Sequence, residues 1–121
     1  MEERDNVVTR ATADSWETQP MPKEQIEVAL NIKLSEERMQ KVEMGIIPQE
    51  MEDRWFMYCS DGHMRWFRSW TGYCIFDAEY IRDGGGYLIT TLHINADRSQ
   101  YTPDTTQDSI NTFRSLLSWL I

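Results

Sequence analysis

The chain has 121 residues, of which 40% are hydrophobic and 12% aromatic, enough for a single domain with its own core. Its formal net charge of −8 argues against general nucleic-acid binding, which depends on Lys and Arg neutralising phosphates. The sequence has no run of roughly 18 apolar residues and begins with an acidic segment rather than an apolar signal. We therefore expect a cytoplasmic protein with no membrane span.

The histidines and cysteines are too few to predict a metal site or a cofactor. There are two of each, and Cys59 and Cys74 lack the CxxC spacing of metal and redox motifs. We expect both cysteines to be reduced, buried thiols. A Cys59–Cys74 bridge between neighbouring strands is the alternative.

The first third of the chain predicts three successive segments. Residues 1–21 are polar, with Trp16 as the large apolar residue, which is typical of a flexible N-terminal arm. Residues 24–34 alternate apolar and polar side chains and favour a strand, although a helical face also fits. Ser35 can cap a helix that has acidic residues in its first turn and that Gly45 ends.

The remainder predicts a series of antiparallel strands followed by a helix. Asp61-Gly62 indicates a tight hairpin turn, and a Gly-rich loop indicates a second hairpin. The capping pattern at Thr105 begins a C-terminal helix with an apolar stripe. The expected strands cover residues 54–60, 63–70, 72–81 and 87–96. We predict an α+β fold over residues 22–121: an antiparallel β-meander of four to five strands packed with one short internal helix and a C-terminal helix.

The stretch between Pro48 and Cys74 mixes aromatic rings with charges of both signs. Arg68 offers a planar fork of donors for phosphate or carboxylate, next to the flat indole of Trp70. Ser69 and Thr71 add hydroxyl groups. Side chains that stack and carry positive charge suit a flat, anionic small molecule. In the alternative interpretation, Trp70 belongs to the core and Arg68 pairs with an acidic neighbour.

Further candidates lie around this group. Glu52 and Asp53 could accept ribose hydroxyls, orient the arginines, or act as general acid and base. Arg54 and Arg65 are expected on neighbouring hairpin strands, where they face a common ligand or are surface charges. Trp55 is a second stacking candidate, and Tyr73 is a candidate pocket wall. The predicted binding residues are therefore Arg68, Ser69, Trp70, Thr71, Trp55, Arg54, Arg65, Glu52, Asp53 and Tyr73, and no catalytic residue is assigned.

Polar residues also alternate along the later strands. Asp77 and Glu79 point to the same side of their strand, where a solvated face is the simplest interpretation. His93 lies among polar residues of the last strand. It could act as a general base, but no Ser or Cys stands at a recognisable nucleophile spacing.

Two segments resemble a known family. The residues 45–56 (GIIPQEMEDRWF) and 68–75 (RSWTGYCI) resemble a bacterial and phage pattern, G-x-x-P-x-x-M-E-D-K-W-F followed by R-S-W-T-G. This pattern is associated with ADP-ribosylglycohydrolase and macro-type, ADP-ribose-processing proteins. The chain has Arg54 in place of the usual Lys, and Phe67 where the pattern has His. The resemblance implies an ADP-ribose-like ligand held around Arg68 to Thr71.

Three functions follow as hypotheses. The leading one is a non-catalytic binder that sequesters an ADP-ribose-like nucleotide signal, for example as a phage anti-defence protein. The second is a hydrolase acting on the same ligands, with Asp53 or Glu52 as the base. The third is an acidic immunity or inhibitor module that binds a basic protein partner. A homo-oligomer is compatible with each of them.

Overall fold

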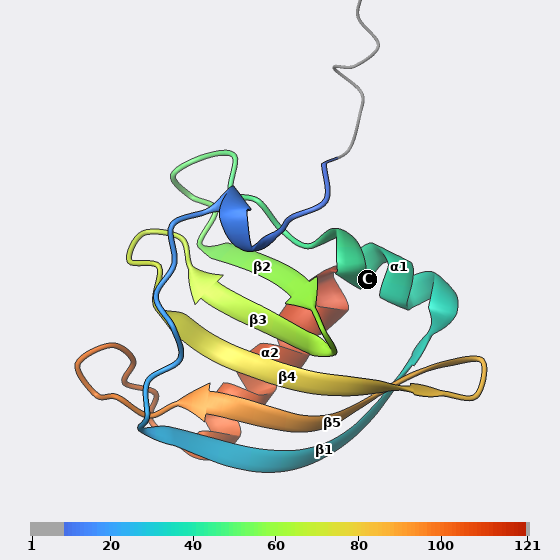
Figure 1. Ribbon diagram of the computed structural model, residues 1–121. Helices are drawn as coiled ribbons and strands as arrows, with labels where there is room; N and C mark the ends of the chain where they lie inside the picture. Colours follow the sequence, from blue (N-terminus) through green and yellow to red (C-terminus); the bar gives the residue numbers. More distant parts are fainter. Residues whose placement is uncertain (1–8, 121) are drawn as a thin grey trace, which may run out of the picture.

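The computed structural model describes residues 9–120, which form a five-stranded antiparallel sheet with two α-helices (Figure 1). The elements are the 3-10 helix η2 (Ala13–Ser15), β1 (Gln25–Ser35), α1 (Glu36–Met44), β2 (Trp55–Ser60), β3 (His63–Arg68), β4 (Cys74–Asp83), β5 (Gly86–Asn95) and α2 (Thr106–Leu120). The strand order is β1-β5-β4-β3-β2, so β2 to β5 form a meander and β1 is added beside β5. The predicted α+β class is confirmed.

Local signals in the sequence set both ends of α1 and the start of α2. The Ser35 hydroxyl accepts a hydrogen bond from the backbone N–H of Arg38 at 3.1 Å, and Gly45 follows the last turn of α1. The Thr105 hydroxyl accepts one from the backbone N–H of Asp108 at 3.0 Å, where α2 begins. These bonds satisfy N–H groups that have no partner inside the helix.

The β2–β3 hairpin turns through the predicted pair, Asp61 and Gly62. Both residues have positive φ, 53° and 81° respectively, the geometry of a tight turn that matches the twist of its strands. The register that follows pairs Tyr58 with Arg65 and Ser60 with His63. This turn therefore sets which residues of β2 and β3 lie opposite each other.

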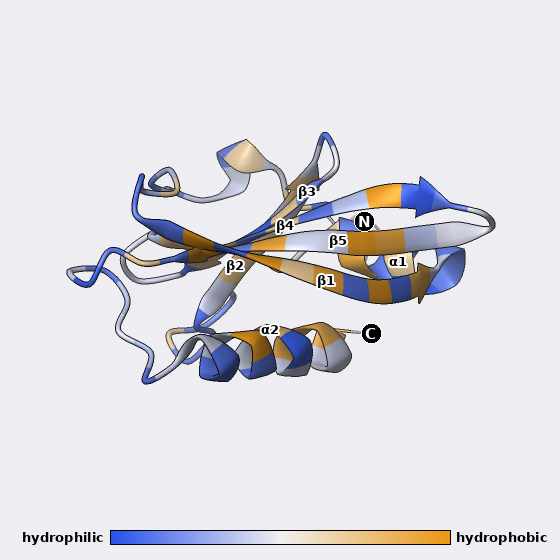
Figure 2. Ribbon diagram, turned by 90° about the horizontal axis from the view of Figure 1, so that it is seen from below, coloured by the Kyte–Doolittle hydropathy of each residue, from blue (hydrophilic) through white to orange (hydrophobic). Residues whose placement is uncertain are grey.

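Helix α2 covers one face of the sheet and turns its apolar side toward it (Figure 2). Phe113 and Leu117 of α2 are buried against the sheet, with Trp66 and Phe76 among their largest neighbours in the main core. Rings of this size remove the most apolar area from water and hold the helix in place.

A smaller core lies at the β2–β3 end of the opposite face. It contains Phe56 and Phe67, and Trp16 packs against it from the N-terminal segment. The Trp16 and Phe56 rings are stacked with centroids 6.1 Å apart. The rest of this face runs from β3 across β4 and β5 to β1 and carries no helix among the described residues, and we call it the open face.

Residues 9–21 follow a defined path against the sheet, whereas positions 1–8 of the predicted arm lie outside the described residues. Ala11 is fully buried, and its N–H donates to the carbonyl of Met44 at 2.9 Å. The N–H of Gln19 donates to the carbonyl of Gly72 at 2.8 Å. Gly72 has φ of 77°, and a Cβ there would lie 2.6 Å from the Glu17 carbonyl oxygen, so the close approach requires glycine.

Both cysteines are free and buried, as the sequence predicts. Burial raises the pKa of each thiol to about 12. Between residues 9 and 120, no helix combines the length and apolar character needed to cross a membrane.

Candidate functional site

The predicted binding residues lie in three separate places. Five of them lie between α2 and the ends of β2 and β3, three lie in the loops beyond β3, and Arg65 lies on the open face. Tyr73 packs against the main core, and its carbonyl accepts the backbone N–H of Arg68 at 3.0 Å. The single pocket expected from the sequence is therefore divided.

The first place is built on Arg68 and Trp55, which are paired across β3 and β2. The Arg68 guanidinium carbon lies 4.5 Å from the centroid of the Trp55 ring. Trp55 is fixed in turn by stacking on Phe76, with centroids 5.9 Å apart. Since Phe76 belongs to the buried core, the arginine lies on a rigid aromatic surface.

Two hollows meet around this pair, and together we call them the α2 groove. The larger has a volume of about 820 Å³ and the smaller about 380 Å³, and Leu116 lines both. The larger is lined by Arg68, Tyr101, Thr102, Pro103, Asp104, Asp108, Asn111, Thr112, Ser115 and Leu116. The smaller is lined by Ile46, Glu52, Asp53, Arg54, Trp55, Leu116 and Trp119. Volumes of this order suit small-molecule ligands.

Two arginines, Arg68 and Arg54, set the electrostatics of the α2 groove. Within residues 9–120, no carboxylate lies within ion-pair distance of Arg68 or Arg54. Burial lowers the pKa of Arg68, and the charge of Arg54 lowers it further while Tyr101 opposes this. The guanidinium still carries its charge at neutral pH. Asp104 and Asp108 supply carboxylates on the α2 side of the groove.

Asp53, one of the two candidate bases, has a structural role in the loop before β2. Its Oδ2 accepts the backbone N–H groups of Gln49 at 2.8 Å and Glu50 at 3.2 Å. These bonds fix the turn that leads into β2. Glu52 is exposed at the rim of the smaller hollow and is the carboxylate of this pair that remains for a ligand.

The second place lies around Trp70, and we call it the loop hollow. Trp70 is 75% exposed, so the alternative that it belongs to the core is wrong. Its Nε1–H donates to the carbonyl of Met51 at 3.0 Å. The Ser69 hydroxyl donates to the carbonyl of Asp53 at 2.7 Å, which ties the two loops together. Thr71 is exposed beside them.

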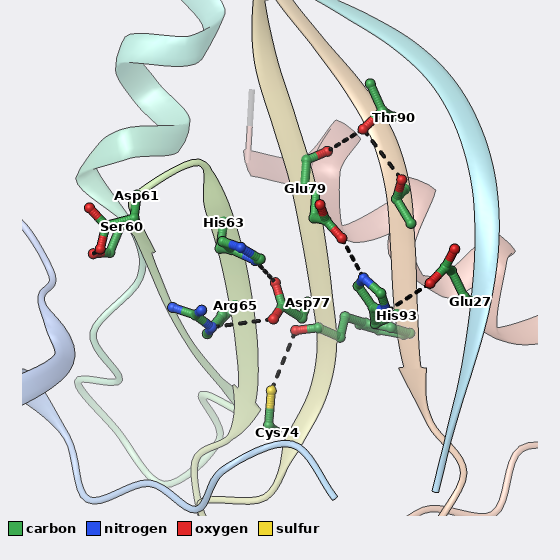
Figure 3. Close-up of polar contacts among 12 residues, drawn as sticks. Glu27, Ser60, Asp61, His63, Arg65, Cys74, Asp77, Glu79, Thr90 and His93 are labelled. Atoms are coloured by element: carbon green, nitrogen blue, oxygen red, sulfur yellow. Dashed lines mark hydrogen bonds and ion pairs between the residues drawn. The ribbon is translucent and has the colours of Figure 1, made fainter. Parts of the chain in front are cut away.

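The third place is a polar row on the open face, shown in Figure 3. His63 Nδ1 lies 2.8 Å from Asp77 Oδ1, and the Nε–H of Arg65 donates to Asp77 Oδ2 at 3.3 Å. On the neighbouring strand pair, His93 Nε2 lies 2.5 Å from Glu79 Oε2. Glu27 of β1 approaches His93 Nδ1 at 3.9 Å. Each histidine thus has a carboxylate partner.

These contacts show that the open face is internally paired. Burial alone would lower the pKa of Arg65, but the Asp77 carboxylate and the Tyr58 hydroxyl together outweigh it and raise that pKa. The hydrogen bond from His93 holds the pKa of Glu79 below its ordinary range. Among the described residues, no group of three or more His, Cys, Asp or Glu is arranged to hold a metal ion.

The sequence interpretation missed this pairing and expected a solvated face for Asp77 and Glu79. Side-chain alternation placed them correctly on one face, but the partner residues depend on the register between β3, β4 and β5. That register pairs His63 with Glu79 and Asp77 with His93. Arg54 and Arg65 do not face a common ligand, because Arg65 points to the open face while Arg54 lines the α2 groove.

No protein-family model matches the chain, and neither curated proteins nor solved structures give a significant match.

Proposed function

We propose that the α2 groove binds a flat, anionic small molecule of the nucleotide type. The observation that carries the proposal is the half-buried Arg68 guanidinium, which lies on Trp55 without a carboxylate partner among residues 9–120. A charged group in partial burial is costly unless an opposite charge meets it. A phosphate would supply that charge and accept two parallel hydrogen bonds.

The residues around Arg68 offer contacts for the phosphate, the base and the ribose of a nucleotide. Arg54 adds a second cation next to Arg68, as its effect on the pKa of Arg68 indicates. Trp55 offers aromatic surface in the smaller hollow and Tyr101 in the larger, and Thr112 lines the larger hollow with Tyr101. Carboxylates such as Asp108 on the opposite wall suit ribose hydroxyls and oppose binding of phosphate on that side.

ADP-ribose is the particular ligand class that the resemblance of residues 45–56 and 68–75 implies. We infer sequestration rather than turnover, because Asp53 is engaged by two backbone N–H groups and the histidines lie on the open face. A small protein that sequesters a nucleotide signal would fit an anti-defence role in a phage.

The test is calorimetry with ADP-ribose, its cyclic derivative and ADP, using the wild type and Arg68→Ala. We expect binding that weakens by about tenfold or more in Arg68→Ala, as for loss of a charge-assisted phosphate contact. Binding should also weaken with rising salt, because the arginines are partly exposed. Ligand recovered intact after denaturing the complex distinguishes sequestration from hydrolysis.

Arg114→Ala is the matched control, since Arg114 is exposed on α2 and does not line the groove. It should bind as the wild type does. Absence of heat with all three ligands, or equal losses in the Arg68 and Arg114 variants, would refute the proposal. Circular dichroism shows whether each variant keeps its fold.

A further inference from the structure

The loop hollow has a different chemistry from the α2 groove. It has a volume of about 430 Å³, and Trp16, Pro48, Met51 and Trp70 form most of its wall. A second hollow of about 590 Å³ continues past the same two indoles toward Gly72. Two tryptophans from distant parts of the chain thus share one concave region.

Both indoles are held by their polar atoms. The Nε1–H of Trp16 donates to the carbonyl of Ser69 at 2.9 Å, and that of Trp70 donates to the carbonyl of Met51 at 3.0 Å. Since an indole has a single polar donor, only the ring surface remains for a ligand. Trp70 nevertheless stays 75% exposed, so this hydrogen bond orients a ring that the core does not bury.

The walls of the hollow are also tied to one another. Asp53 fixes the turn at Gln49 and Glu50 through its side chain, and its carbonyl accepts the Ser69 hydroxyl at 2.7 Å. Trp16 joins the same unit through Ser69. The hollow is therefore preorganised, which lowers the entropic cost of binding.

The charge around the indoles is negative. Glu50 lines the first hollow and Glu17 lines the second, and no Lys or Arg of the described chain lines either. The whole chain carries a formal charge of −8. These carboxylates oppose an anionic ligand and favour a cation.

We propose that the loop hollow binds an alkylated ammonium group between Trp16 and Trp70. Aromatic faces attract such cations through their quadrupole, the methyl groups contact the rings, and Glu50 and Glu17 add Coulombic attraction. The same head group occurs on small quaternary amines and on methylated lysine side chains of proteins. The α2 groove, which Arg68 and Arg54 line, is not expected to take this ligand.

The test uses choline and its neutral isostere 3,3-dimethylbutan-1-ol, followed by the indole N–H signals in ¹⁵N-resolved NMR. We expect choline to shift the signals of Trp16 and Trp70 and to bind about tenfold more tightly than the neutral isostere. Trp70→Ala should abolish the shift at Trp16, and Glu50→Gln should weaken choline binding severalfold.

Trp119→Ala is the matched control, because Trp119 is 71% exposed on α2 and lines neither hollow. It should leave choline binding unchanged. Equal binding of choline and the neutral isostere, binding that persists in Trp70→Ala, or no shift with choline would overturn the proposal. A trimethyl-lysine peptide that binds about tenfold more tightly than choline, and is displaced by it, would identify a protein as the source. Equal affinity would identify a small amine.

Discussion

Arg65 and Arg68 lie on the same short strand, but β3 directs them to opposite faces of the sheet. Arg65 meets Asp77 on the open face, where His63 shares the same carboxylate. Arg68 lies on Trp55 in the α2 groove, with no carboxylate in ion-pair range within residues 9–120. Residue type alone therefore does not mark a binding site. The useful signal is a partly buried charge whose counter-charge the fold does not supply.

The largest expected effect is the slow reaction of the two buried cysteine thiols. Cys59 belongs to the main core and Cys74 to the small core of the opposite face, and burial raises the pKa of both to about 12. At pH 8 we expect native thiols to react about a thousandfold more slowly with an aromatic disulfide reagent than in urea. Kinetics of thiol labelling at each cysteine, with the other replaced by Ser, check this. Fast labelling of only one would show that its side of the sheet opens.

Phe113→Ala should weaken the packing of α2 on the sheet, because it removes the ring that anchors the helix. The Phe113 ring is fully buried and contacts Phe76, with centroids 5.8 Å apart. We expect a loss of about 3–5 kcal/mol in the free energy of unfolding, measured by urea denaturation. Arg114→Ala on the exposed side of the same helix should change it by less than about 0.5 kcal/mol. A small effect of Phe113→Ala would mean that the α2 groove does not depend on this packing.

The two arginines should respond in opposite ways to replacement by Ala. Arg65→Ala leaves the largely buried Asp77 with one partner fewer, so we expect about 1 kcal/mol of destabilisation and unchanged nucleotide binding. Arg68→Ala should change stability by less than about 0.5 kcal/mol, because the lost contact with Trp55 is offset by removing a partly buried, unpaired charge. Urea denaturation and calorimetry on both variants test this contrast, in which Arg65→Ala loses stability and Arg68→Ala loses nucleotide binding. Similar stability losses in the two would remove the distinction between the sites.

The smallest expected effect is the pH dependence of the open face. The hydrogen bond from His93 lowers the pKa of Glu79, so the folded state binds a proton there less readily than the unfolded state. The resulting stabilisation is present above the ordinary glutamate value of 4.5 and is lost as the pH falls through the lowered value. Because Glu79 is partly exposed, we expect only about 0.5 kcal/mol.

Urea midpoints between pH 6 and pH 3 should therefore fall less steeply in Glu79→Gln than in the wild type. Glu52→Gln, at an exposed position outside the polar row, is the matched control and should follow the wild type. A wild-type slope in Glu79→Gln would show that this pair adds nothing to stability.

Local sequence patterns predict several parts of the structure. The Ser35 cap, the Asp61-Gly62 turn and the Thr105 cap act over a few residues, so the sequence locates the start of α1, the first hairpin turn and the start of α2. Alternation along the predicted strand 63–70 places Met64, Trp66, Arg68 and Trp70 on one face. The first three do share a face, but β3 ends at Arg68 and Trp70 lies exposed in the loop that follows. Each of these depends only on backbone geometry near the residue concerned.

The candidate sites depended on contacts that no local pattern records. The addition of β1 beside β5 brings Glu27 to His93, and the β3–β4 register brings His63 and Arg65 to Asp77. The path of residues 9–21 brings Trp16 to Ser69. The sequence by itself determined the elements, their faces and the presence of unusual arginine and tryptophan side chains. Only the tertiary structure decided which arginine meets a carboxylate within residues 9–120, because the partners come from segments far apart in the chain and their pairing is set by packing and strand register.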